Sequence, residues 1–234
     1  MPDLSAGPVP DPASGASGKA RVLAVLYAAL GAANSAAVAK RFHAGAWATK
    51  PLLMPVLTAY TLASARGRAG LRLPAAGMIL SGLGDTALLV SETSDSESAE
   101  RWFVPGMSCF AAAHACYITA LARSGAARGV RPRVAAGYGA AWAVLISVLW
   151  RRLGDLRVPV AAYSLLLVSM AILASGRNRE AAAGGALFVV SDALIACGLA
   201  GIDVAPRQDA AVMPTYLAGQ FLLAAGWLRP RDNR

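Results

Sequence analysis

The chain has 234 residues, of which 56% are hydrophobic and 15% charged, and its mean hydropathy is +0.50. This composition excludes an ordinary water-soluble domain of the same length and indicates a membrane protein. The formal net charge of +9 would suit a nucleic-acid partner. However, the basic residues are spread among the predicted loops rather than gathered on one face, so no nucleic-acid partner is expected.

The N-terminal part contains two different kinds of sequence. Residues 1–18 are rich in Pro, Gly, Ser and Ala without periodicity, which predicts a disordered tail. The apolar stretch 21–39 follows Lys19 and contains Ala37-Val38-Ala39, so it would also suit a cleaved signal peptide. Because seven further hydrophobic segments follow, an uncleaved first helix is the favoured interpretation.

Eight mostly apolar stretches predict eight transmembrane helices, since about 20 such residues cross the hydrocarbon core of a bilayer. They are 21–39, 50–65, 71–90, 102–122, 133–150, 157–175, 182–201 and 212–228. The second is the shortest, opens with Lys50 and contains two prolines. Lipid cannot satisfy open backbone groups, so the predicted fold is an all-α membrane bundle over residues 19–229. A short basic tail, 230–234, follows it.

The charge distribution predicts the orientation of this bundle. With the N-terminus inside, 14 of the 22 Lys and Arg residues fall in inner segments, and the outer loop SETSDSESAER is acidic. By the positive-inside rule, both termini are predicted to be cytoplasmic. The Ala- and Arg-rich composition is typical of a bacterial GC-rich genome, so we expect the plasma membrane.

The cysteines and histidines limit redox and metal chemistry. Cys109, Cys116 and Cys197 fall within predicted helices and are interpreted as small buried hydrophobes. Cys109 and Cys116 lie about 10 Å apart along one helix, too far for a disulfide. With two histidines in the chain, no metal-ligand motif can be assembled, and no metal or other cofactor is expected.

Two acidic residues lie inside hydrophobic spans: Asp85, in ILSGLGDTALLV, and Asp192, in LFVVSDALIAC. A carboxylate at the centre of a membrane helix costs roughly 2.5–3.5 kcal/mol on insertion scales. Such residues therefore normally face the bundle interior and serve a function. The alternative is a buried carboxylate that only bonds neighbouring helices.

The spacing of polar residues suggests an internal repeat. Asp85 and Asp192 are 107 residues apart, on the third and seventh predicted helices. His114 follows the first aspartate by 29 residues, and Gln220 follows the second by 28. This favours a parallel four-plus-four repeat, whose pseudo-two-fold axis along the membrane normal would bring the aspartates face to face.

Further polar side chains occur at similar depth in the predicted helices. His114 and Tyr117 are three residues apart and share one face of the fourth helix. Tyr216 and Gln220 are four residues apart and share one face of the eighth helix, and Tyr163 lies on the sixth helix. Any one alone is more often a bond between helices than a ligand contact. Together they indicate a site.

At these residues the chain resembles a known family. The ordered series KPLLMPVL, SGLGDTALL, GMSCFAAAHACYI, YSLLLVSMAILA, GGALFVVSDALIA and YLAGQFLL, from about Lys50 to Leu223, resembles the YhhN-like lysoplasmalogenase family of multi-pass membrane proteins. The resemblance implies hydrolysis of the vinyl ether bond of lysoplasmalogens, alkenyl-glycerophosphoethanolamine or -choline, to a fatty aldehyde and a glycerophospho-base. The implied site residues are Lys50, Asp85, His114, Tyr117, Tyr163, Ser191, Asp192, Tyr216 and Gln220.

The implied reaction fits two buried carboxyl groups. A vinyl ether is cleaved by acid through an oxocarbenium ion, as a glycoside is, so one aspartate would donate a proton while the other stabilises the cation or orients water. The sequence does not decide which aspartate is the acid. His114 would relay protons or bond Asp85. Lys50, which by itself would snorkel to the interface, would bind the substrate phosphate. Tyr163, Tyr216 and Gln220 would orient water or the glycerol.

Three alternative functions remain open at this stage. A small proton-coupled transporter would use the same aspartate pair and a parallel repeat. An intramembrane metal hydrolase would use Asp85, His114 and Asp192, and a structural lipid-binding protein would fit the composition. The expected partners are a lysophospholipid substrate and membrane lipids. The head group, the chain length and the oligomeric state are not decided by the sequence.

Overall fold

The computed structural model describes residues 12–65, 67–204 and 208–232, and every regular element in these ranges is a helix. The α-helices are α1 (Pro12–Ala39), α2 (His43–Ala63), α3 (Arg72–Thr93), α4 (Ser96–Arg123), α5 (Pro132–Leu149), α6 (Arg157–Ser175), α7 (Arg179–Leu199) and α8 (Gln208–Leu228). Two short 3-10 helices, η1 (Ala126–Gly129) and η2 (Gly154–Leu156), flank α5. The predicted all-α fold is confirmed.

Seven of these α-helices contain a stretch long and apolar enough to cross a membrane, which suggests a multi-pass membrane protein. The candidate spans are Gly18–Ala39, Arg72–Thr93, Arg101–Arg123, Pro132–Leu149, Gly154–Ser175, Arg179–Leu199 and Gln208–Leu228. Only α2 is not among them. It has 21 residues, but these include His43, Lys50, Pro51 and Pro55, which lower its apolar character.

Several helices begin earlier than the hydrophobic stretches predicted. α6 matches its predicted range, whereas α2 begins at His43 rather than residue 50, and α4 begins at Ser96 rather than residue 102. Hydropathy marks the part of a helix that suits lipid, whereas a helix can continue past the hydrocarbon region into polar sequence, as α2 and α4 do at their N-terminal ends. α1 likewise begins at Pro12, inside the predicted tail. Residues 1–11 lie outside the described residues, so their disorder stays a prediction.

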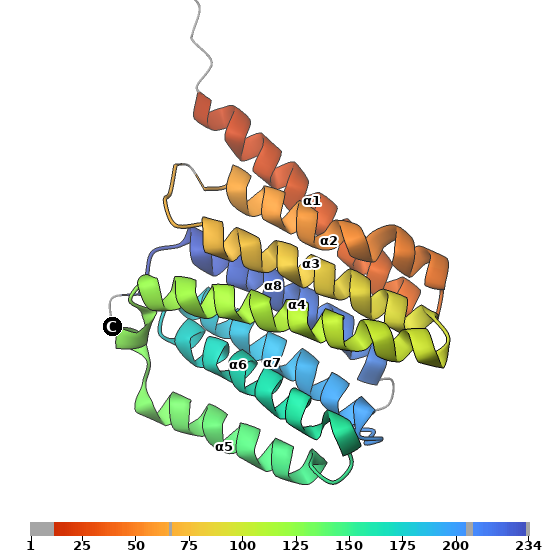
Figure 1. Ribbon diagram of the computed structural model, residues 1–234. Coiled ribbons are helices and arrows are strands. Elements are labelled where there is room, and N and C mark those ends of the chain that lie inside the picture. Colours follow the sequence, from red (N-terminus) through yellow and green to blue (C-terminus); the bar gives the residue numbers. More distant parts are fainter. Residues whose placement is uncertain (1–11, 66, 205–207, 233–234) are drawn as a thin grey trace, which may run out of the picture.

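The helices pack side by side in one bundle (Figure 1). The closest pairs are α1 with α2, α3 with α4, and α7 with α8. Further contacts join α2 to α3, α4 to α6, α6 to α7 and α1 to α8, so that α8 and α4 lie between the outer helices. α5 lies at one edge, where it packs mainly against α6 (Figure 1).

Small residues bring α7 and α8 close together. A Cβ atom added to Gly184 on α7 would lie 2.6 Å from the backbone nitrogen of Leu223 and 2.8 Å from the carbonyl oxygen of Gly219, both on α8. Because both of these atoms belong to the backbone, a rotation of side chains could not relieve the contact. Membrane helices associate through such close backbone approach because lipid offers them little hydrophobic drive. This close approach therefore also fixes the position of Gln220, which directly follows Gly219, and of Tyr216, three residues before it.

A polar cap joins the end of α8 to the start of α7. The Asn178 side chain accepts a hydrogen bond from the backbone nitrogen of Ala181, as an N-cap residue does. Its amide nitrogen donates to the carbonyl oxygens of Gly226 and Pro230. Arg177 donates to the carbonyl oxygen of Gly226 as well. These contacts satisfy carbonyl groups that the end of α8 would otherwise leave open.

Candidate functional site

A cavity of about 1130 Å³ opens at the end of the bundle that carries the α1–α2 and α7–α8 connections. Every α-helix except α5 contributes to its wall within the described residues. The deep part contains Asp85, Tyr163, Ser191, Asp192 and Tyr216. Apolar side chains form much of the rest, among them Phe103, Met107, Phe110, Ile195 and Met213. A cavity with apolar walls and a few converging polar groups is the common form of a small-molecule site.

The structure brings the two membrane aspartates to this one cavity. Asp85 lies on α3 and is buried, whereas Asp192 lies on α7 and is half-buried. The Tyr216 hydroxyl donates a hydrogen bond of 2.8 Å to Oδ2 of Asp85, and the Tyr163 hydroxyl donates to Oδ2 of Asp192. Each carboxyl group is therefore positioned by a tyrosine from another helix.

A hydrogen-bond chain behind the cavity supports Asp85. The Tyr117 hydroxyl donates to Oε1 of Gln220 at 3.0 Å, and Nε2 of Gln220 donates to the Tyr216 hydroxyl oxygen at 3.3 Å. Since Gln220 donates into that oxygen, the Tyr216 proton is directed to Asp85. Tyr117 and Gln220 are buried and are not part of the cavity wall, so they act through Tyr216 rather than on a ligand.

His114 does not hydrogen-bond Asp85, so that part of the expectation is wrong, whereas its role as a proton relay stays a prediction. Its Nδ1 atom lies 2.7 Å from the carbonyl oxygen of Phe110, one turn earlier on α4. Its Nε2 atom has no hydrogen-bond partner within the described part of the chain. The ring is fully buried and packs edge-on against Tyr163 and Phe188, with centroids 5.5 and 4.9 Å away. The sequence did not predict that α4 turns this ring towards other aromatic rings.

Ser191, next to Asp192 on α7, lies in the cavity wall. Its hydroxyl donates to the carbonyl oxygen of Val212 on α8 at 3.1 Å. Within the described residues, no three His, Cys, Asp or Glu side chains cluster as metal ligands would.

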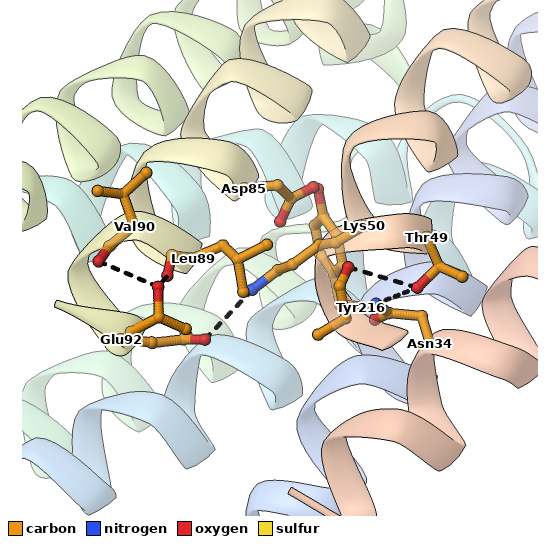
Figure 2. Close-up of polar contacts among 10 residues, drawn as sticks. Asn34, Thr49, Lys50, Asp85, Leu89, Val90, Glu92 and Tyr216 are labelled. Atoms are coloured by element: carbon orange, nitrogen blue, oxygen red, sulfur yellow. Dashed lines mark hydrogen bonds and ion pairs between the residues drawn. The ribbon is translucent and has the colours of Figure 1, made fainter. Parts of the chain in front are cut away.

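Lys50 lies further into the protein than its sequence suggested. It is seven residues inside α2 and its side chain is only 7% exposed, so it does not snorkel to an interface. Its Nζ atom lies 3.7 Å from Oε2 of Glu92 on α3, whose side chain is 60% exposed. Figure 2 shows the Lys50 side chain pointing from α2 towards Glu92, with Asp85 on the same helix as the glutamate. Both members of the ion pair line the cavity.

Glu92 is a cavity residue that sequence reasoning missed, because it was assigned to an acidic loop. α3 continues to Thr93, so Glu92 remains helical. It follows Asp85 by seven residues, which places it two turns along the same face of α3. That seven-residue spacing was the signal that could have found it. Other charged residues in the cavity wall are Lys40, Arg41 and Asp209, and His43 lies beside them.

A model of the YhhN family matches residues 45–227. The chain belongs to the YhhN family. All nine residues predicted for the site fall inside the matched range.

Two kinds of curated relative were found. The human protein named lysoplasmalogenase TMEM86B is 33% identical over 127 residues, which is 54% of each chain. A protein of Mycobacterium bovis named lysoplasmalogenase is 32% identical over 161 residues, 62% of this chain and 60% of its own length. A Mycobacterium tuberculosis protein of the same name matches equally well. This chain thus spans between half and two thirds of the length of these relatives. No solved structure shows significant similarity.

Proposed function

We propose that this YhhN-family chain hydrolyses the vinyl ether bond of lysoplasmalogens, giving a fatty aldehyde and a glycerophospho-base. The observation that carries the proposal is the pair Asp85 and Asp192, which line one cavity inside a membrane bundle, each with a tyrosine hydroxyl on its carboxylate. The names of the curated relatives support the same reaction. They do not favour the transporter alternative.

The shape of the cavity suits a lipid with one chain. Its apolar lining, with Phe103, Met107 and Ile195, would take the alkenyl chain, while the charged groups at the mouth would remain near water. Lys50 would bind the phosphate between these two regions. In the membrane the alkenyl tail is already surrounded by hydrocarbon, so an apolar lining lets it pass from lipid into the cavity without the cost that a polar lining would impose.

The reaction needs an acid and a stabilising charge. A carboxylic acid O–H bond breaks, and its proton adds to the alkenyl carbon beyond the one that bears oxygen, with the π electrons forming the new C–H bond. The ether oxygen shares a lone pair with the remaining cationic carbon, which gives an oxocarbenium ion. Water adds to that carbon and loses a proton to the carboxylate. The hemiacetal then breaks its bond to the glycerol oxygen, which takes a proton as the aldehyde forms.

We assign the acid to Asp192 and the stabilising carboxylate to Asp85. The direction of the hydrogen bonds at Asp85 supports this, because Gln220 donates into Tyr216 and so directs the tyrosine proton onto Asp85, as suits an anion. In the part of the chain that the structure describes, the Tyr163 hydroxyl donates to Asp192 but accepts no such second hydrogen bond. A protonated Asp192 could therefore donate to substrate while Tyr163 holds its other oxygen in place.

The membrane topology is part of the proposal. We propose that α2 also spans the membrane, since its 21 residues extend about 31 Å and it packs between α1 and α3 rather than facing lipid all round. The inner helix neighbours fit two halves related by a pseudo-two-fold axis, because α4 contacts α6 as α8 contacts α2, whereas α1 packs more closely on α8 than α5 does on α4. Both termini would be cytoplasmic by the positive-inside rule. The Ala- and Arg-rich composition of a bacterial type favours the plasma membrane as the location.

The experiment uses the purified protein in detergent micelles with three lysolipids that differ only at the first glycerol carbon: alkenyl, alkyl and acyl. We expect aldehyde from the alkenyl lipid alone. Asp192→Asn should abolish it, and Asp85→Asn should lower the rate at least about 100-fold, the smallest contribution usual for such groups. Full activity in both variants, or release of fatty acid from the acyl lipid at the same rate as aldehyde, would refute the proposal.

A further inference from the structure

We infer that Glu92 binds the cationic amine of the substrate head group, so that Lys50 and Glu92 together recognise a zwitterionic head group. This inference rests on the proposed function, because it assigns the part of the lipid that lies beyond the ether bond. Glu92 is the partner of the buried Lys50, lines the same cavity as the aspartates and is exposed at the cavity mouth.

The position of the pair along α3 fits the length of the lipid. Seven residues separate Asp85 from Glu92, which is a rise of about 10 Å along the helix. The ether oxygen and the head-group nitrogen of an alkenyl-glycerophosphoethanolamine are also about 10 Å apart when partly extended, by ordinary bond lengths. A substrate whose vinyl ether lies at the aspartates would therefore place its amine near Glu92.

The arrangement of charges fits the head group as well. Nζ of Lys50 lies 3.7 Å from the Glu92 carboxylate, and a phosphate and its ammonium are separated by a two-carbon link of similar size. A zwitterion can lie against the pair with its phosphate on Lys50 and its ammonium on Glu92. The internal ion pair is then replaced by two contacts of opposite charge, and neither side chain is left unpaired.

The difference in exposure within the pair shows which partner can change contacts. Lys50 is fixed by burial, whereas Glu92 is 60% exposed and can turn towards a ligand at the mouth. The contact itself is 3.7 Å long and leaves most of the Glu92 carboxylate open to the cavity mouth, so Glu92 can exchange Lys50 for a ligand cation. A lysolipid with a bare phosphate head group has no ammonium for Glu92, and its phosphate on Lys50 would be repelled by the Glu92 carboxylate. We therefore expect it to bind more weakly than a lysolipid with an amine.

The test measures binding rather than turnover. Uncleavable alkyl ether lysolipids are titrated into the full-length protein in nonionic detergent, one with a phosphoethanolamine head group and one with a bare phosphate. The wild-type protein should bind the amine-bearing lipid at least tenfold more tightly. In Glu92→Gln the ratio of the two dissociation constants should fall to within about twofold of one, because the amine-bearing lipid binds more weakly and the bare phosphate lipid binds more tightly. Glu92→Ala should have the same effect.

Two control variants make the result specific. Glu180→Gln makes the same chemical change at the other end of the bundle, where Glu180 pairs with Arg229, and should leave the ratio unchanged. Asp209→Asn removes another acid from the cavity mouth and should change the ratio less than twofold. Equal binding of both lipids by the wild type, an unchanged ratio in both Glu92 variants, or loss of the preference in Asp209→Asn would each overturn the inference.

The same samples separate this inference from the proposed function. If the protein forms no aldehyde from alkenyl lysolipids but prefers the amine-bearing lipid through Glu92, the reaction is wrong and the head-group site stands. If aldehyde forms but Glu92→Gln keeps the wild-type preference, the reaction stands and the head-group site is wrong.

Discussion

Replacing Tyr216 by Phe removes one hydroxyl group from the wall of the cavity and keeps the ring. The lost contact is the 2.8 Å hydrogen bond to Asp85, between two side chains that are each only 4% exposed. A hydrogen bond to a charged group contributes about 1.5–3 kcal/mol. Because about 1.4 kcal/mol corresponds to a tenfold change in rate, kcat should fall about 10- to 150-fold if Asp85 acts as the stabilising carboxylate. KM should change much less.

The stability of this variant should fall by less than its activity. Hydrogen bonds between membrane helices average about 0.6 kcal/mol in measured double-mutant cycles, so unfolding by SDS in mixed micelles should shift by about 1 kcal/mol or less. Tyr60→Phe is the matched control, since Tyr60 stacks on Phe221 with ring centroids 5.4 Å apart and is not part of the cavity wall. A Tyr216→Phe protein whose kcat stays within twofold of the control would refute the role given to Asp85.

Three further predictions concern packing, capping and binding. Gly184→Ala should destabilise the protein by about 1–3 kcal/mol, because the new methyl group meets the backbone of α8. Gly137→Ala, in open space on α5, should be neutral or stabilise the protein by up to about 1 kcal/mol. SDS unfolding compares the two variants, and equal free energies of unfolding would contradict the close packing of α7 and α8. Asn178→Ala removes a helix cap and two bonds to the end of α8, and should cost about 1–3 kcal/mol in the same assay with KM unchanged. Lys50→Gln should raise KM for an alkenyl lysophospholipid about tenfold with a smaller effect on kcat, and the reverse pattern would remove Lys50 from phosphate binding.

The depth of polar residues in the helices could be predicted from the sequence, because a membrane helix has a fixed rise and hydropathy marks its centre. Asp85 and Asp192 were placed near the middle of their helices in this way, and the structure puts both in one cavity. The direction in which a side chain points was not predictable. His114, for example, packs against aromatic rings, and its Nδ1 contacts its own helix rather than Asp85.

Helix ends were the other part that the sequence could not provide. Charged residues end a hydrophobic stretch without ending the helix, so α2 and α3 both extend beyond their predicted ranges. As a result Lys50 was placed at the start of a helix, and Glu92 was placed in a loop. The ion pair between them forms because α2 and α3 pack against each other, and a local sequence pattern does not predict which helices are neighbours.

The most direct test of the central claim is where the proton goes during cleavage. The alkenyl lysolipid is hydrolysed in heavy water, and the aldehyde is reduced at once to the alcohol to prevent later exchange. A carboxylic acid fixed in the cavity delivers its deuteron to one face of the double bond, so we predict one deuterium at the second carbon of the chain, in a single configuration. A mixture of both configurations, or no deuterium at that carbon, would contradict proton donation by a buried aspartate.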